Sequence, residues 1–149
     1  MPQSLGFEVD LPLAFDAAIA ATRDALKAEG FGVLTEIDMQ GAFKEKLGRD
    51  FRPYTILGAC NPPLAFSALT ADPTIGLLLP CNVTVEANGP NHSVVRLVDP
   101  QVMLSSAPGK LSPALEDIAA DAHQRIERVA GALRNTVDLQ SQSAFALIE

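Results

Sequence analysis

The sequence is poor in the residues that most often carry chemistry or cross-link small folds. It contains no tryptophan, one tyrosine, two cysteines and two histidines among 149 residues. Two cysteines cannot form the dense disulfide framework of a small secreted domain. A chain of this length buries roughly two-thirds of its unfolded surface, so it needs no such framework. His92 and His123 lie far apart and lack the spacing of paired metal ligands.

Positive charge is also scarce. Eleven Lys and Arg residues stand against eighteen Asp and Glu residues, which gives a net charge of −7. This balance argues against a nucleic-acid partner, because sequence-independent binding to nucleic acids depends on a surplus of Lys and Arg. With 48% apolar and 19% charged residues, the chain is too apolar to be disordered. We therefore expect one compact domain.

Established catalytic motifs are missing as well. The sequence has neither a phosphate-binding loop ending in Lys-Ser/Thr nor the Gly-x-Ser-x-Gly turn of many hydrolases. Gly30-Phe31-Gly32 lacks the third glycine of a dinucleotide-binding fingerprint. Whether the protein is an enzyme is left open by these absences.

Charge is almost absent from one long segment. Between residues 53 and 85 the only charged residue is Asp72. Residues 53–71 approach the length of about 20 that spans a bilayer, but Asn61-Pro62-Pro63 would break the helix in its middle. We expect no membrane partner, and instead a buried strand, a turn and a core helix. The N-terminus lacks a basic segment followed by an apolar run, which favours a cytoplasmic protein with reduced thiols.

The pattern of apolar residues, caps and prolines predicts an α+β fold. Strands are expected over residues 4–9, 31–37, 54–60, 82–87 and 93–98, with the strand over 54–60 buried on both faces. Helices are expected from Pro12 to Gly30, between Asp38 and Gly48, from Asn61 to Ala71, and from Ser112-Pro113 onwards. This order predicts two layers, a mixed or antiparallel sheet with helices mainly on one face.

The predicted domain covers residues 1–135. The tail over residues 136–149 is ambiguous in its periodicity. It ends in an apolar cluster, Phe145-Ala146-Leu147-Ile148, that is suited to packing on a partner subunit.

Two Cys-Asn pairs stand at the borders of apolar strands inside the uncharged segment: Cys60-Asn61 and Cys81-Asn82. If the strand ending at Cys60 runs antiparallel to the strand starting at Cys81, the two thiols meet at one end of the sheet. If the strands are parallel, the thiols lie about a strand length apart, ~17–20 Å. Cys60 also precedes a helix N-terminus, whose positive end favours a thiolate.

These cysteines allow several interpretations. Buried cysteine often acts as a small apolar residue, in which case Asn61 is only a cap. The functional alternatives are a redox dithiol, a site for a thiophilic metal with Cys60 and Cys81 as ligands, and a ligand pocket lined by thiols and amides. Two thiolates rarely complete a zinc site, although a homodimer would supply four.

One short stretch of the acidic chain is basic. It contains Lys44, Lys46, Arg49 and Arg52 around Glu45 and Asp50. A solvated helix face is the simple interpretation. The functional one is an anion site at the mouth of the cysteine pocket, with Glu36 and Asp38 as alternative partners for these cations.

Four segments of the sequence resemble the bacterial and archaeal family called Domain of Unknown Function 302. They are residues 29–38, residues 51–62 with both Tyr54 and Cys60-Asn61-Pro62, residues 75–83 with Cys81-Asn82, and Asp99-Pro100 with Met103. The resemblance covers residues 4–135 and implies a small α+β domain that forms a homodimer. It implies no activity, since the family name records none.

Together these observations favour a dimeric module that binds or senses a small molecule or a metal. The candidate ligand-binding residues are Cys60, Asn61, Cys81, Asn82, Glu36, Arg52 and Tyr54. A structural domain with core cysteines and a thiol-dependent redox protein or enzyme are the alternatives. No cofactor is indicated.

Overall fold

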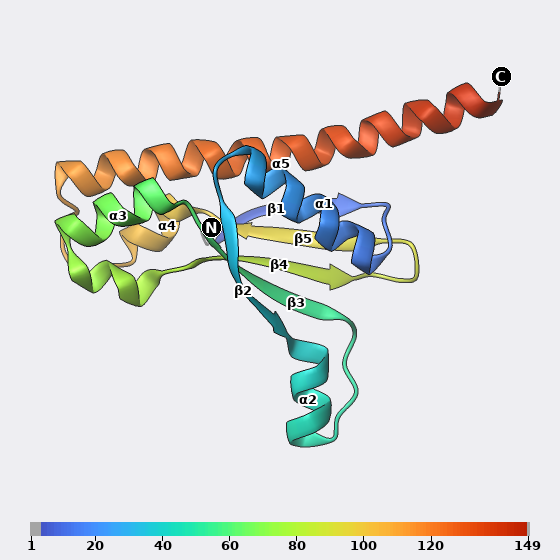
Figure 1. The fold of residues 1–149 in the computed structure, drawn as a ribbon, viewed down its shortest axis with the longest axis horizontal. Coiled ribbons are helices and arrows are strands. Elements are labelled where there is room, and N and C mark those ends of the chain that lie inside the picture. Colours follow the sequence, from blue (N-terminus) through green and yellow to red (C-terminus); the bar gives the residue numbers. More distant parts are fainter. Residues whose placement is uncertain (1–3, 149) are drawn as a thin grey trace.

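The computed structural model describes residues 4–148, and from residue 137 onwards it describes the backbone alone. Figure 1 shows the order of the elements. They are β1 (Gly6–Leu11), α1 (Phe15–Ala28), β2 (Gly32–Asp38), α2 (Met39–Leu47), β3 (Tyr54–Cys60), α3 (Pro62–Ala71), the 3-10 helix η1 (Pro73–Leu78), β4 (Cys81–Ala87), β5 (Ser93–Val98), α4 (Pro100–Ser105) and α5 (Pro113–Ile148).

The five strands form one antiparallel sheet in the order β1-β5-β4-β3-β2. Helices α1 and α5 pack on one face of it, as Figure 1 shows. The core lies between these two layers and is made of Val, Leu and Ala from the strands and both helices. The predicted α+β architecture, with helices mainly on one face, is therefore confirmed, and the sheet is antiparallel.

Strand alternation gives the sheet a second face, which we call the open face because neither α1 nor α5 covers it. Two rows of residues that are partners across the strands face outward there. The first row is Glu8, Arg96, Thr84, Ile56 and Ile37, and the second is Asp10, Val94, Glu86 and Tyr54. The prediction that residues 54–60 are buried on both faces holds only in part: Gly58 is buried, whereas Tyr54 and Ile56 are half-buried because neither α1 nor α5 covers them.

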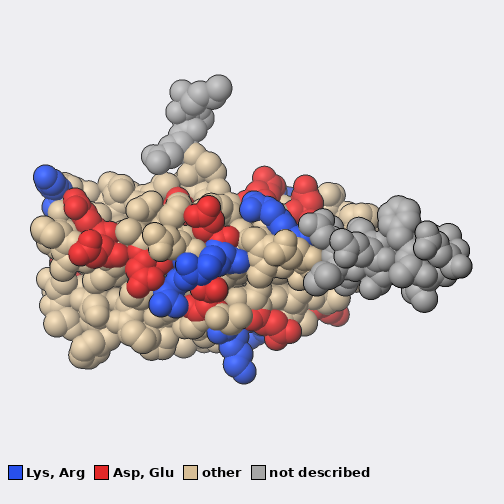
Figure 2. Space-filling view, turned by 90° about the horizontal axis from the view of Figure 1, so that it is seen from above, with Lys and Arg blue, Asp and Glu red and all other residues tan. Residues whose placement is uncertain are grey.

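Ion pairs join the strands across the open face. The buried carboxylate of Glu86 accepts hydrogen bonds from Arg96, at 2.8 Å, and from Arg52. These contacts, led by the hydrogen bond from Arg96, hold the pKa of Glu86 below its ordinary value. Arg96 also reaches Glu8, at 3.2 Å. The helical side carries both signs of charge as well, and Figure 2 shows acidic and basic side chains interspersed over it.

Local capping explains where several helices begin and end. Asp38 accepts a hydrogen bond from the amide of Gly41, and Asn61 accepts one from the amide of Leu64. Ser112 does the same for Leu115 at the start of α5. Gly48 ends α2 with a left-handed φ of 63°, the conformation that glycine adopts without strain. These four boundaries agree with the sequence prediction.

Other expectations need correction. β1 extends to Leu11 and α1 starts at Phe15, so Pro12 lies outside the helix. Helices η1 and α4 were not predicted, because each is only six residues long and shows no clear periodicity.

The predicted helix at residues 62–71 forms, with Leu64 and Ala68 on its inward side, but it is less buried than a core helix. Only Ala68 of α3 is buried, while Phe66 is 74% exposed. Leu77, in the following η1, is 89% exposed. The segment with little charge therefore folds into the strand β3 followed by α3 and η1, which lie at the surface. A short helix at the end of the sheet can bury only one of its sides.

The segment over residues 136–148 continues α5 as helix and extends past the sheet in Figure 1. The side chains of the proposed packing cluster, residues 145–148, lie outside the described part of the structure. Among the described residues, no helix combines the length and the apolar character that crossing a membrane requires.

Gly58 offers a direct test of the sheet's packing. A Cβ atom at this position would overlap Oγ1 of Thr35 and lie 2.9 Å from Cγ of Pro80. We expect Gly58→Ala to lower the free energy of unfolding by about 1–3 kcal/mol, the usual cost of overpacking. Urea unfolding measures this loss. Gly32→Ala is the matched control, since nothing lies within 4 Å of its Cβ position. An equal effect of the two substitutions would refute the steric explanation.

Candidate functional site

A pocket of about 400 Å³ lies at the end of the sheet, where β3 finishes and β4 begins. Helix α3 and η1 form one wall, and α4 and α5 form another. The lining is almost entirely apolar: Phe31, Leu34, Ala59, Leu64, Ala65, Ala68, Leu69, Ile75, Gly76, Leu79, Pro80, Pro100, Met103, Leu104, Ile118 and Ala122, together with Thr35, Cys60, Asn61 and Cys81. Its size and character are those of small-molecule sites in proteins.

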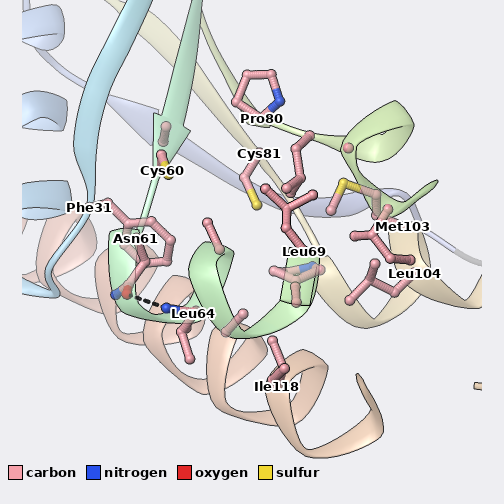
Figure 3. A pocket seen from close by; sticks show the side chains of 18 of the residues that line it. Phe31, Cys60, Asn61, Leu64, Leu69, Pro80, Cys81, Met103, Leu104 and Ile118 are labelled. Atoms are coloured by element: carbon pink, nitrogen blue, oxygen red, sulfur yellow. Dashed lines mark hydrogen bonds between the residues drawn. The ribbon is translucent and has the colours of Figure 1, made fainter. Parts of the chain in front are cut away.

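The antiparallel pairing of β3 with β4 brings the two cysteines to this pocket. Ala59 is the direct partner of Cys81, so Cys60 lies one residue beyond that partner, at the adjacent strand end. Figure 3 shows both thiols pointing toward the space above α3, with Phe31 and Met103 at opposite sides. The parallel arrangement, with the thiols a strand length apart, is thereby excluded.

Both thiols are free, and their surroundings favour the protonated form. Burial raises the pKa of the Cys81 thiol to about 11, and the nearby Cys60 adds to the rise. Burial also raises the pKa of Cys60, which is half-buried. The expectation that the start of α3 favours a Cys60 thiolate is not supported, because burial raises the pKa of this thiol.

Asn61 is held by the backbone on both sides of its amide group. Its Oδ1 accepts a hydrogen bond from the Leu64 amide at 3.3 Å, and its Nδ2 donates to the Glu29 carbonyl at 3.4 Å. Arg125 of α5 donates to that same carbonyl at 3.1 Å. Asn61 therefore joins the start of α3 to the end of α1 and shapes the pocket rather than presenting its full amide to a ligand.

The other four candidate residues lie elsewhere. Asn82 is exposed and pairs with Gly58, on the side of β4 opposite to Cys81. Glu36 forms an ion pair with Arg23 at 2.6 Å. Arg52 pairs with Glu86, and Tyr54 begins β3 at the end away from Cys60. The basic stretch thus lies at the opposite end of β3 from the pocket.

Sequence reasoning missed the wall that α4 and α5 supply. Met103 and Leu104 come from α4, and Ile118 and Ala122 from α5. The apolar periodicity of α5 indicated an inward-facing stripe at Ile118 and Ala122, but it did not show what that stripe would face. Among the described residues, no group of three or more His, Cys, Asp or Glu side chains is placed to hold a metal ion.

The raised thiol pKa values can be tested by alkylation. We expect the rate of modification by iodoacetamide to keep rising through pH 9 at both cysteines, with Cys60 reacting faster because it is less buried. Mass spectrometry of Cys60→Ser and Cys81→Ser separates the two sites, and the urea-unfolded chain provides the reference. A rate that levels off below pH 8 at either thiol would contradict the expectation.

The capping role of Asn61 predicts a stability effect. Asn61→Ala removes the acceptor for the Leu64 amide, so we expect a loss of about 0.5–2 kcal/mol in the free energy of unfolding. Asn61→Asp keeps a capping oxygen but sets a second oxygen, in place of the Nδ2 donor, against the Glu29 carbonyl, so it should recover only part of that loss. Urea unfolding of both variants provides the measurement, and equal stability of the alanine variant and the parent chain would rule out this role.

Comparisons with known proteins agree with this architecture. The model of the family described as "Domain of unknown function DUF302" matches residues 7–133. A similar solved structure is that of an uncharacterized conserved DUF302 protein from Bacillus stearothermophilus, at a TM-score of 0.77 and 29% sequence identity, covering 88% of this chain and 99% of that one. The search of curated proteins gave no match. The match over residues 7–133 shows that the chain belongs to the DUF302 family.

Proposed function

We propose that the protein is a binding or sensing module for a small, uncharged, mainly apolar molecule, held in the pocket at the end of the sheet. The pocket itself carries this proposal. It has a volume of about 400 Å³, and it brings together Cys60, Asn61 and Cys81, three of the residues that the sequence singles out. A cavity of this size is larger than the gaps that ordinary packing leaves in a protein core.

The lining decides the chemical class of the ligand. None of the residues that line the pocket carries a charge at neutral pH, and both thiols are protonated. A charged ligand would lose its hydration there without gaining a partner of opposite charge, which is costly. The thiols and Thr35 offer weak polar contacts that suit a hydroxyl or carbonyl group on an otherwise apolar ligand.

The alternatives are less well supported. A thiol-dependent redox protein needs an accessible thiolate of low pKa, whereas burial raises both pKa values here. A thiophilic metal would have only two predicted ligands in one chain, the thiols of Cys60 and Cys81. A purely structural role for the cysteines fits their burial but leaves the pocket unexplained.

We further propose that the module acts in the cytoplasm as a homodimer. The two free thiols fit a reducing compartment. The helical continuation of α5 past the sheet is available for packing on a partner subunit, as the sequence suggests for residues 136–149.

A neutral fluorescent probe tests the pocket. We expect N-phenyl-1-naphthylamine to bind, and Ala65→Phe to weaken that binding at least tenfold, because the added ring occupies the pocket. Ala71→Phe is the matched control: it adds the same ring to an exposed position at the end of α3. Fluorescence titration gives both affinities.

Native mass spectrometry of freshly purified protein complements the titration. A retained organic mass supports the proposal, and a retained metal would favour the metal alternative. Absence of probe binding, or equal weakening by both phenylalanine variants, would overturn the proposed pocket.

A further inference from the structure

Helix α2 extends away from the rest of the molecule. Figure 1 shows it beyond the ends of β2 and β3, far from α5. None of its nine residues is buried, although it carries Met39, Phe43 and Leu47. Leu47 is 63% exposed. A helix with apolar side chains and no buried residue is poorly stabilised by its own chain, because tertiary packing supplies most of the stability of short helices.

The base of α2 is nevertheless firmly built. Phe43 packs edge-on against Phe51 with ring centroids 5.2 Å apart, and Phe51 lies 6.2 Å from Tyr54. The guanidinium of Arg52 stacks 4.4 Å above the ring of Phe51. Asp38 and Gly48 cap the two ends. We call residues 39–52 the α2 arm, since these contacts fix its direction relative to β3.

The open face beside the arm changes in character from one edge to the other. Near the arm it presents Ile37, 47% exposed, and Ile56. At the far edge, β1 presents Glu8 and Asp10, both exposed. The arm has the opposite charge: it holds four Lys and Arg residues against Glu45 and Asp50. Lys44 pairs with Asp50 and Arg52 with Glu86, which leaves Lys46 and Arg49 as the outward cations. One molecule therefore carries a basic arm at one edge of this face and an acidic strand at the other.

We propose that the open face and the α2 arm form the interface with a second copy of this chain. If two open faces pack together about a twofold axis running along the strands, β2 of each copy lies over β1 of the other. Each basic arm then meets the partner's acidic β1 edge, while the apolar residues around Ile37 and Ile56 are covered. An axis across the strands would instead place β1 over β1, acid on acid, with the two arms at opposite ends of the other edge.

The dimensions suit this arrangement. Packed sheets lie about 10 Å apart, and a helix of nine residues is about 13 Å long, so the arm is long enough to bridge the gap between two facing sheets. Five strands spaced about 4.8 Å apart, with about 20 Å of length each, give a face of roughly 24 by 20 Å. With the arm added, such a face approaches the ~800 Å² per partner of a standard interface. This inference rests on the proposed homodimer and specifies its surface.

Sedimentation velocity at micromolar concentration tests the interface. Ile37→Glu places a carboxylate in the covered apolar region, so we expect the dissociation constant of the dimer to rise at least tenfold. Leu77→Glu is the control, because Leu77 is exposed in η1, away from the open face. Far-UV circular dichroism and a thermal melt verify that each variant folds.

A charge-reversal pair supplies an independent measurement. Lys46→Glu and Asp10→Lys should each weaken the dimer several-fold, and the two together should restore it, since the arm of one copy faces β1 of the other. Both residues are exposed, so their substitution leaves the fold intact.

The outcomes separate the two proposals. A parent chain that stays monomeric at 100 µM would overturn both the homodimer and this interface. A dimer that Ile37→Glu and the charge reversals leave unchanged would keep the homodimer but overturn this surface. Dissociation by Ile37→Glu together with rescue by the paired reversal would establish the interface.

Discussion

The antiparallel pairing of β3 with β4 is the constraint on which the rest of this structure depends. It places the end of one apolar strand beside the start of the next, and Ala59 beside Cys81. The loop between them must therefore leave and re-enter the sheet at the same end, which is where α3 and η1 fold over to make a pocket wall. The close approach of Pro80, directly before β4, to Gly58 of β3 shows how little space this pairing leaves.

The scarcity of charge in this part of the chain acts through solvation. Both cysteines lie among apolar groups, so burial is the main cause of their raised pKa values, and at Cys81 the nearby Cys60 adds to the rise. The same scarcity leaves Phe66 and Leu77 on the surface, because α3 and η1 bury only the side that faces the pocket. The wall that α3 and η1 form is therefore uncharged both on the side that lines the pocket and, apart from Asp72, on the side exposed to solvent.

Much of the fold could be predicted from the sequence, because its determinants are local. The caps at Asp38, Asn61 and Ser112 act over three residues, and strand alternation acts over two. What could not be predicted depends on contacts between distant segments. The sequence left open whether β3 and β4 run antiparallel, and that pairing decides that Cys60 and Cys81 share a pocket while Asn82 faces away. Met103 and Ile118 reach the same cavity only because α4 and α5 fold back over the sheet end.

The carbonyl of Glu29 accepts hydrogen bonds from Asn61 and from Arg125. This single peptide group therefore ties together the end of α1, the start of α3 and the middle of α5. A molecule that pushed α3 outward on entering the pocket would stretch the hydrogen bond from Asn61 to this carbonyl. At 3.4 Å that bond is already close to the longest distance at which a hydrogen bond holds. A displacement of α3 would therefore reach the packing of α1 against α5 through this one carbonyl.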